Sequence, residues 1–276
     1  MTLLAYFGHH KAASTWIASI IDVICADTGW NLAYLPEPRH FDHDLPGYVA
    51  KNKIDFISFV NARMGHIKDL PEFRGFHVVR DPRDVIASGY FSHLSKHPTH
   101  DWPELIPHRK VLQSVSKEEG MLAEIEFSEQ FLKHMSEWDY NQENVLELRQ
   151  EEFTASPYRG FLEVFEHLGV LDTSHYNKIR WPGYLLSSSL NILRRKGAPV
   201  PRKKRSTIPG ERVLGCVYDQ RFEKYAGGRK KGETDNSSHY RKGQAGDWRN
   251  HFDDVHVEAF KARYGDLVER LGYGDW

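Results

Sequence analysis

The chain has 276 residues, of which 40% are apolar and 27% charged, and its formal net charge is −1. This composition is typical of a globular chain with a sizeable core, so it excludes collagen-like and disordered proteins. The balanced charge gives no reason to expect nucleic acid or a membrane as a partner, and no apolar run reaches the roughly 18 residues of a spanning helix. Two unpatterned cysteines and an N-terminus without a signal-like segment predict a cytoplasmic protein.

A phosphate-binding loop is predicted near the N-terminus. Residues 3–7 form an apolar strand, residues 8–13 a tight loop, and a helix begins at Ser14 with apolar residues at helical spacing. Backbone N–H groups at a helix N-terminus attract an anion, and Lys11 adds a positive charge. The loop lacks the Walker A pattern, in which Ser or Thr directly follows the lysine, because Ser14 lies three positions after Lys11. An ordinary strand–helix turn with an unrelated lysine fits this stretch equally well.

Residues 31–47 are predicted as an irregular loop, because they contain three prolines. The loop carries Glu37 among several histidines and aspartates. Such a set could hold a metal ion, but no helical histidine pair and no cysteine accompanies it. We therefore expect a solvated acidic loop and no metal.

Further strands are predicted at residues 54–60, 75–80 and 144–149. Asp81 and Pro82 begin a helix after the second of these, which puts Arg80 at the end of a strand and Ser88 two turns into the helix. Arg80 could bind a second anion there, and an ion pair with a neighbouring aspartate fits the spacing as well. Residues 116–139 are predicted as one long amphipathic helix. The pattern indicates an α/β fold: a single domain with a central parallel β-sheet flanked by helices, and the phosphate-binding loop after the first strand.

Residues 171–240 are predicted as a mobile substrate lid inserted in a domain that spans residues 1–276. Within it, residues 191–210 carry seven lysines and arginines and no acidic residue. This run could bind a polyanion, but no aromatic residues interleave with the charges, which favours a solvated loop. Arg241 and Lys242 follow, and Gly243 would let the backbone approach an anion closely.

Three stretches together resemble the PAPS-dependent sulfotransferase family. Residues 10–16, HKAASTW, are similar to its 5′-phosphosulfate loop, PKSGTTW. Residues 76–88, FHVVRDPRDVIAS, are similar to its 3′-phosphate segment, with the same spacing from Arg80 to Ser88. Residues 241–250, RKGQAGDWRN, are similar to its C-terminal motif RKGxxGDWKN. The order and separation of the motifs match over nearly the whole chain.

The resemblance implies a donor, 3′-phosphoadenosine 5′-phosphosulfate (PAPS), and a product, adenosine 3′,5′-bisphosphate (PAP). It implies in-line transfer of a sulfuryl group to a hydroxyl or amine of a small-molecule or glycan acceptor, with Lys11 as a catalytic residue on the leaving phosphate oxygen and no metal. The implied donor-binding residues are Lys11, Ala12, Ala13, Ser14 and Thr15 for the 5′ end, Trp16 for adenine, and Arg80, Ser88, Arg241, Lys242 and Gly243 for the 3′-phosphate.

The chain departs from the family pattern in ways that leave the catalytic base open. The usual histidine after the second predicted strand is replaced by Val60-Asn61-Ala62. His66 lies four residues further on, and Glu37 lies where another branch of the family keeps a glutamate. We favour Glu37 over His66, because His66 requires a shift in register. The family's C-terminal dimer motif is not evident, so the oligomeric state stays open.

Two other functions are compatible with parts of the sequence. A small-molecule kinase would also use a phosphate loop, but it predicts a Walker A pattern and dependence on Mg²⁺. A noncatalytic polyanion-binding module would use the basic run of residues 194–205, and it predicts binding that falls steeply with salt.

Overall fold

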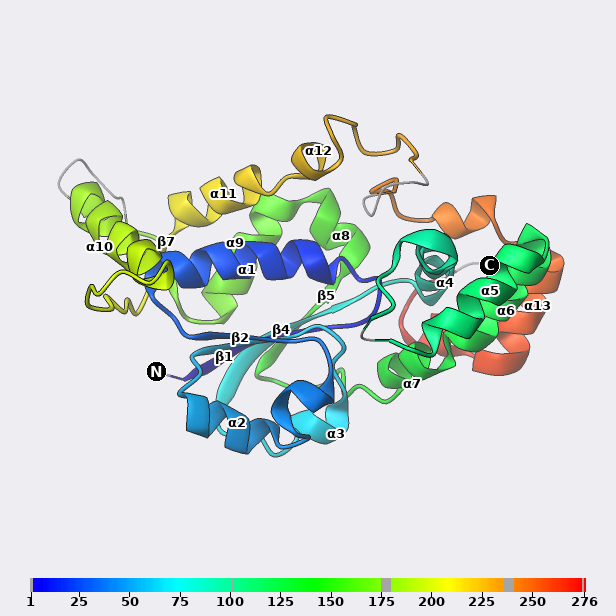
Figure 1. Ribbon diagram of the computed structural model, residues 1–276, viewed down its shortest axis with the longest axis horizontal. Helices are drawn as coiled ribbons and strands as arrows, with labels where there is room; N and C mark the ends of the chain where they lie inside the picture. Colours follow the sequence, from blue (N-terminus) through cyan, green and yellow to red (C-terminus); the bar gives the residue numbers. More distant parts are fainter. Residues whose placement is uncertain (1, 101, 175–179, 236–240, 275) are drawn as a thin grey trace. The chain divides into compact units, whose positions relative to one another are not determined.

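The computed structural model describes residues 2–100, 102–174, 180–235, 241–274 and 276 (Figure 1). The chain divides into two compact units. Unit 1 comprises Met1–His9, Ala13–Val79 and Asp139–Arg221, and unit 2 comprises His10–Ala12, Arg80–Trp138 and Phe222–Trp276. Within the part of the chain that the structure describes, no helix has the length and apolarity needed to cross a bilayer.

Unit 1 is built on a five-stranded sheet in which every pair of neighbouring strands is parallel, as the sequence predicted. The strand order is β2-β3-β1-β4-β5. The strands are β1 (Leu3–Gly8), β2 (Leu32–Leu35), β3 (Phe56–Phe59), β4 (Phe73–Val79) and β5 (Val145–Arg149). Strand β2 corrects the prediction of an irregular loop there, because its four residues precede the first proline and its side chains at Ala33 and Leu35 are buried.

Helices cover both faces of this sheet (Figure 1). On one face lie α1 (Ser14–Thr28), α9 (Pro157–His167) and α11 (Gly210–Asp219), and on the other lie α2 (Leu45–Asn52) and α3 (Met64–Ile67). Unit 1 also contains η1 (Pro38–Phe41), α8 (Gln150–Ala155), α10 (Arg180–Arg195) and the short pair β6 (Leu171–Asp172) and β7 (Ile208–Pro209). The isoleucines of α1 pack with β1 and with Phe161 of α9 in one apolar core.

Unit 2 is helical. Its elements are α4 (Pro82–Phe91), the π-helical turn η2 (Ser92–Lys96), α5 (Leu105–Ser114), α6 (Lys117–Phe127), α7 (Glu129–Ser136), α12 (Phe222–Tyr225), η3 (Asp247–Asn250), α13 (Asp254–Tyr264) and α14 (Leu267–Arg270). The prediction of one helix over residues 116–139 is wrong, because the helix is broken at Ser128. At the break the Ser128 hydroxyl donates to the Glu124 carboxylate at 3.1 Å, and the Ser128 carbonyl accepts from the amides of Phe131 and Leu132, with which the next helix begins.

The loop predicted over residues 191–210 is confirmed for residues 196–207, which form no helix or strand, whereas residues 191–195 belong to α10 and residues 208–209 to β7. The run begins inside α10, and two of its cations, Arg202 and Lys204, bind the carboxylate of Asp55. The amide of Arg205 donates to the carbonyl of Thr28 at 2.9 Å. These contacts lie within unit 1 and attach the basic run to the sheet-bearing unit. Whether residues 171–240 move as a lid stays a prediction.

Candidate donor-binding site

The loop between β1 and α1 has an unusual backbone. Lys11 and Ala13 adopt φ angles of 62° and 59°, in the left-handed region that disfavours residues with a Cβ. The carbonyl of Ala13 accepts hydrogen bonds from the amides of Trp16 and Ile17 at 3.1 Å. No side chain of the described residues caps helix α1, so its first-turn N–H groups are suited to an anionic ligand.

Lys11 lies in unit 2 with Arg80, which follows the end of β4. The Arg80 guanidinium donates from Nη1 to the Lys11 carbonyl oxygen at 2.9 Å, whereas its closest approach to the Asp84 carboxylate is 3.8 Å. Burial and the charge of Arg80 lower the pKa of Lys11 from 10.5 to about 8. Arg80 therefore anchors the loop that carries Lys11, and the two cations lie close together.

The motif at residues 241–248 is held by its own aspartate. Arg241 and Lys242 both donate to the carboxylate of Asp247, and the side chains of Asn250 and His251 approach the same group at 2.9 and 3.1 Å. Although burial opposes ionisation, the hydrogen bonds from Lys242 and Arg241 keep the pKa of Asp247 well below its usual range.

Gly243 is required by the backbone of this motif. Its φ angle is 63°, and a Cβ there would lie 2.7 Å from the ring of Phe222. Any side chain at this position would therefore strain the turn that presents Arg241 and Lys242.

Asp84 holds the C-terminal motif in place, a contact that the sequence analysis did not identify. Its carboxylate is fully buried and accepts hydrogen bonds from the amides of Gly246 and Trp248 at 2.7 and 2.9 Å. It thereby joins α4, the helix that carries half-buried Ser88, to the C-terminal motif. The sequence held no local signal for these contacts, because Asp84 lies in the first turn of α4 and its two amide donors are 162 and 164 positions away.

Trp16 and the first residues of α1 belong to unit 1. The indole N–H of Trp16 donates to the carbonyl of Gln220 at 2.8 Å, and its ring meets that of Phe161 edge to face. Ser14 is half-buried and Thr15 is exposed. The described contacts thus fix the Trp16 ring on the first turn of α1.

The two predicted base candidates, Glu37 and His66, also lie in unit 1. The Glu37 carboxylate accepts from Arg63 and from Asn61, each at 3.0 Å, so its oxygens are already engaged. His66 packs edge to face against Phe41, and burial together with the charge of neighbouring His43 lowers its pKa. These contacts fix the orientation of the Glu37 carboxylate within unit 1.

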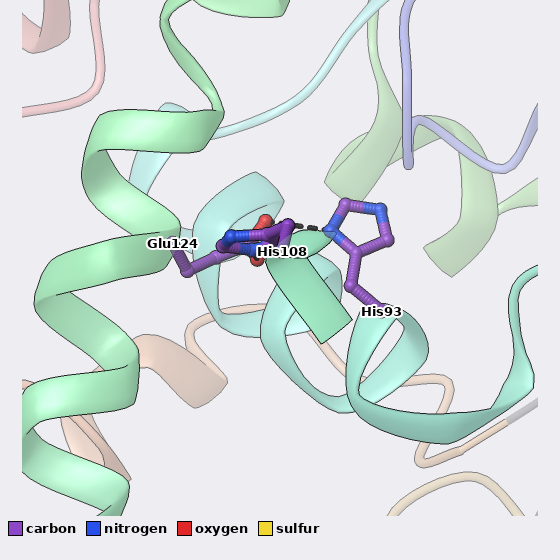
Figure 2. Close-up of side chains that lie close together, drawn as sticks. All are labelled: His93, His108 and Glu124. Carbon is purple, nitrogen blue, oxygen red and sulfur yellow. Dashed lines mark hydrogen bonds and ion pairs between the residues drawn. The ribbon is translucent and has the colours of Figure 1, made fainter. Parts of the chain in front are cut away.

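A buried polar cluster in unit 2 was not predicted (Figure 2). Glu124 of α6 lies between two imidazoles, with His93 Nδ1 2.8 Å from Oε1 and His108 Nε2 2.8 Å from Oε2. The three ligand-type atoms lie within 4.8 Å of one another. Because each carboxylate oxygen already accepts at hydrogen-bond distance, we describe this cluster as a hydrogen-bonded network.

The comparisons with known proteins bear on the fold. No protein-family model matches the chain, and no curated protein matches its sequence. Among solved structures, mouse sulfotransferase SULT7A1 complexed with PAP is similar, with a TM-score of 0.51 and 15% identity over 97% of this chain and 84% of that one. Retinol dehydratase in complex with androsterone and PAP has a TM-score of 0.49 and a sequence identity of 14%, and the match covers 96% of this chain and 80% of that one. The chain therefore has the α/β fold of a sulfotransferase.

Proposed function

We propose that the protein is a PAPS-dependent sulfotransferase. The observation that carries the proposal is the group of cations in unit 2: Arg80 anchors the loop of Lys11, and Asp247 orients Arg241 and Lys242. PAPS has two separate anionic groups, and cations held in place by buried carboxylates are suited to both. The sulfotransferase fold supports this assignment.

The reaction is transfer of a sulfuryl group to an acceptor hydroxyl or amine. The bond from sulfur to the leaving phosphate oxygen breaks as the bond from the acceptor to sulfur forms. Lys11 stabilises the negative charge that develops on the leaving oxygen, and the loop of residues 11–16 binds the 5′ end of the donor. Arg80, Arg241 and Lys242 bind the 3′-phosphate, for which Ser88 and the backbone at Gly243 supply further donors.

The remaining assignments follow from the sequence. Residues 1–276 act as one functional domain in which residues 171–240 cover the acceptor, and the acceptor is a small molecule or a glycan. Glu37 and His66 are the sequence-based candidates for the base that removes the acceptor's proton. We expect activity in the cytoplasm and without added metal.

Mass spectrometry tests this proposal directly. The protein is incubated with PAPS and a library of alcohols, phenols, amines and short glycans, and we expect one class to gain the mass of SO₃ as PAP appears. Lys11→Ala should abolish the product, whereas Lys133→Ala, which alters an exposed lysine of unit 2, should not. Transfer of phosphate from ATP in the presence of Mg²⁺, with no product from PAPS, would contradict the proposal in favour of a kinase.

A further inference from the structure

Helix α10 of unit 1 (Figure 1) exposes an apolar face. Leu185, Leu186 and Leu193 are 55%, 64% and 48% exposed, and Leu186 is the most exposed large apolar side chain among the described residues. With 3.6 residues per turn, the three positions lie within an arc of about 100° on one side of the helix. A helix of a globular protein usually turns such a stripe toward the core, so leucines on the solvent side require an explanation.

Polar side chains hold the opposite face of α10 against α1. Ser188 and Asn191 are buried, and so is Asp27 of α1. The Ser188 hydroxyl donates to the Asp27 carboxylate at 2.8 Å, and the Asn191 side-chain amide donates to the Asp27 carbonyl oxygen at 3.0 Å. Rotation of α10 to bury the leucines would break these buried bonds, so the helix is fixed with its apolar face outward.

The basic run after α10 folds back along the helix. Nη1 of Arg194 donates to the carbonyl oxygen of Val200 at 3.2 Å. The backbone of Lys203 makes two hydrogen bonds with the side-chain amide of Asn191, at 2.8 and 3.0 Å. Lys196 directly follows α10, and its amide donates to carbonyl oxygens of the last turn at 3.1 Å. These bonds keep the basic residues beside the leucines.

Two aspartates of unit 1, Asp22 and Asp55, neutralise part of the positive charge in this run. The cations that they bind are Arg195, Arg202 and Lys204. Three further cations are exposed and form no ion pair with a carboxylate of the described residues: Arg194, Lys196 and Lys203. The net charge of −1 gave no reason to expect an anionic surface as a partner, but positive charge is concentrated here, next to the leucines.

We propose that this α10 surface, the three leucines with Arg194, Lys196 and Lys203, docks the protein on a membrane that contains anionic lipids. The leucines enter the boundary between headgroups and acyl chains, and the cations bind the negatively charged headgroups. An apolar helical face bordered by lysine and arginine is typical of helices that lie in the plane of the membrane interface. The inference concerns unit 1 alone and does not depend on the proposed sulfuryl transfer.

The charges favour a membrane over a second copy of this chain as the partner. A two-fold interface presents the same patch from both subunits, so the cations beside the leucines would face one another. Residues 191–210 contain no acidic residue that could compensate. A bilayer with anionic lipids supplies both an apolar layer for the leucines and negative charge for the cations.

The test is sedimentation of the full-length protein with vesicles of phosphatidylcholine alone or mixed with phosphatidylserine. The protein should bind the mixed vesicles far more tightly, and added salt should weaken this binding. Lys196→Ala should lower the apparent affinity by about fivefold, the usual effect of one basic residue at such a surface. Leu186→Glu should lower it by about tenfold or more, because an apolar side chain leaves the interface.

Two matched variants in unit 2 serve as controls. Lys133→Ala removes an exposed lysine, and Val111→Glu changes a valine that is 45% exposed. Both should bind the mixed vesicles as the wild type does. Because all four side chains are exposed, the thermal unfolding midpoint should stay close to that of the wild type, which separates loss of binding from loss of the fold.

Three outcomes overturn the inference. Sedimentation that is absent with both kinds of vesicle, or equal with both, would exclude recognition of anionic lipid. Unchanged binding by Leu186→Glu would exclude the α10 surface. A wild-type dimer in analytical ultracentrifugation that Leu186→Glu dissociates would assign the leucines to contact between two copies of the chain. Failure of the sulfotransferase proposal is seen separately, because vesicle binding requires neither PAPS nor turnover.

Discussion

The two units of the protein are stabilised by different chemistry. Unit 1 has a continuous apolar core between the sheet and α1, α9 and α11, and among the described residues Asp27 is its one fully buried acid. Unit 2 buries the carboxylates of Asp81, Asp84, Glu124 and Asp247 beside arginine, lysine and histidine partners. Burying a charge is unfavourable unless it is paired and hydrogen-bonded, so a unit with many such groups is specialised for holding charge in place.

The difference suggests a division of labour. Unit 1 positions the first turn of α1 through apolar packing, which tolerates volume-conserving changes. Unit 2 supplies oriented cations and the hydrogen-bonded network of His93, Glu124 and His108. Each of these side chains is held by only a few hydrogen bonds, so the loss of a single polar atom changes the geometry. Substitutions of charged residues in unit 2 should therefore reduce activity more than comparable changes in unit 1, and the following predictions test this comparison from the largest effect to the smallest.

Lys11→Ala should have the largest effect. Loss of a group that acts on charge developing in the transition state typically lowers kcat by about 10²–10³-fold. Affinity for PAP should fall less, because the other cations remain. The measurement is kcat with the identified acceptor, together with calorimetric titration of PAP. Equal proportional losses in both quantities would make Lys11 a ground-state binding residue instead.

Asp84→Ala should destabilise the protein by roughly 1–3 kcal/mol, because it leaves the buried amide of Trp248 and the partly buried amide of Gly246 without an acceptor. Asp84→Asn retains one acceptor and should cost less. Chemical denaturation measures both differences. Equal stability of Asp84→Ala and the wild type would show that the buried carboxylate of α4 does not hold the C-terminal motif.

The pH dependence of PAP binding should report on Lys11. Its pKa is lowered to about 8, so the ammonium is lost as the pH rises through 8, and affinity for PAP should fall by up to about tenfold per pH unit above that value. The Lys11 side chain also makes the ligand-free protein more stable as the pH rises from about 8 to about 10.5. In this range the unfolded chain still holds a proton on Lys11 that the folded protein has lost, so a rise in pH favours the folded state. Lys11→Arg should flatten the alkaline fall, since arginine stays charged.

Ala13→Gly should have the smallest effect and the opposite sign. The left-handed backbone at Ala13 costs about 1–2 kcal/mol for a residue with a Cβ, and glycine's greater freedom when unfolded offsets part of the relief. We expect a gain of about 0.5–1 kcal/mol in the free energy of unfolding. Ala12→Gly is the matched control and should lose stability, because Ala12 is buried and does not need a positive φ. A loss in Ala13→Gly would contradict the left-handed geometry of the loop.

The sequence predicted the parts of unit 1 that depend on local pattern. Apolar runs identified β1, β3, β4 and β5, and helical spacing identified α1, because these signals arise within a few residues of each other. Through their motifs it also predicts that Lys11, Arg80 and Arg241, all in unit 2, bind the donor, and this stays a prediction. Those motif residues lie in loops and at the first turns of helices. Glycine, proline and aspartate are typical of such positions, so the turns and helix starts could be predicted from the sequence.

The buried network of unit 2 could not be predicted in the same way. His10 and His93 are separated by 83 positions, and His93 and Glu124 by 31, so no local periodicity joins them. Glu124 lies within the stretch predicted as one amphipathic helix, and the Ser128 hydroxyl at the break donates to its carboxylate. Strand β2 was missed because four residues are too few to show a period beside a proline-rich loop.

Discrimination between PAP and 5′-AMP tests the central claim most directly. The cations at Arg80, Arg241 and Lys242 are proposed to bind a 3′-phosphate, which PAP carries and 5′-AMP lacks. At a concentration of about 100 Kd, PAP should stabilise the full chain by roughly 2.7 kcal/mol in thermal or chemical unfolding, and 5′-AMP at the same concentration should stabilise it far less. Equal stabilisation by the two nucleotides, or none by PAP, would contradict the account.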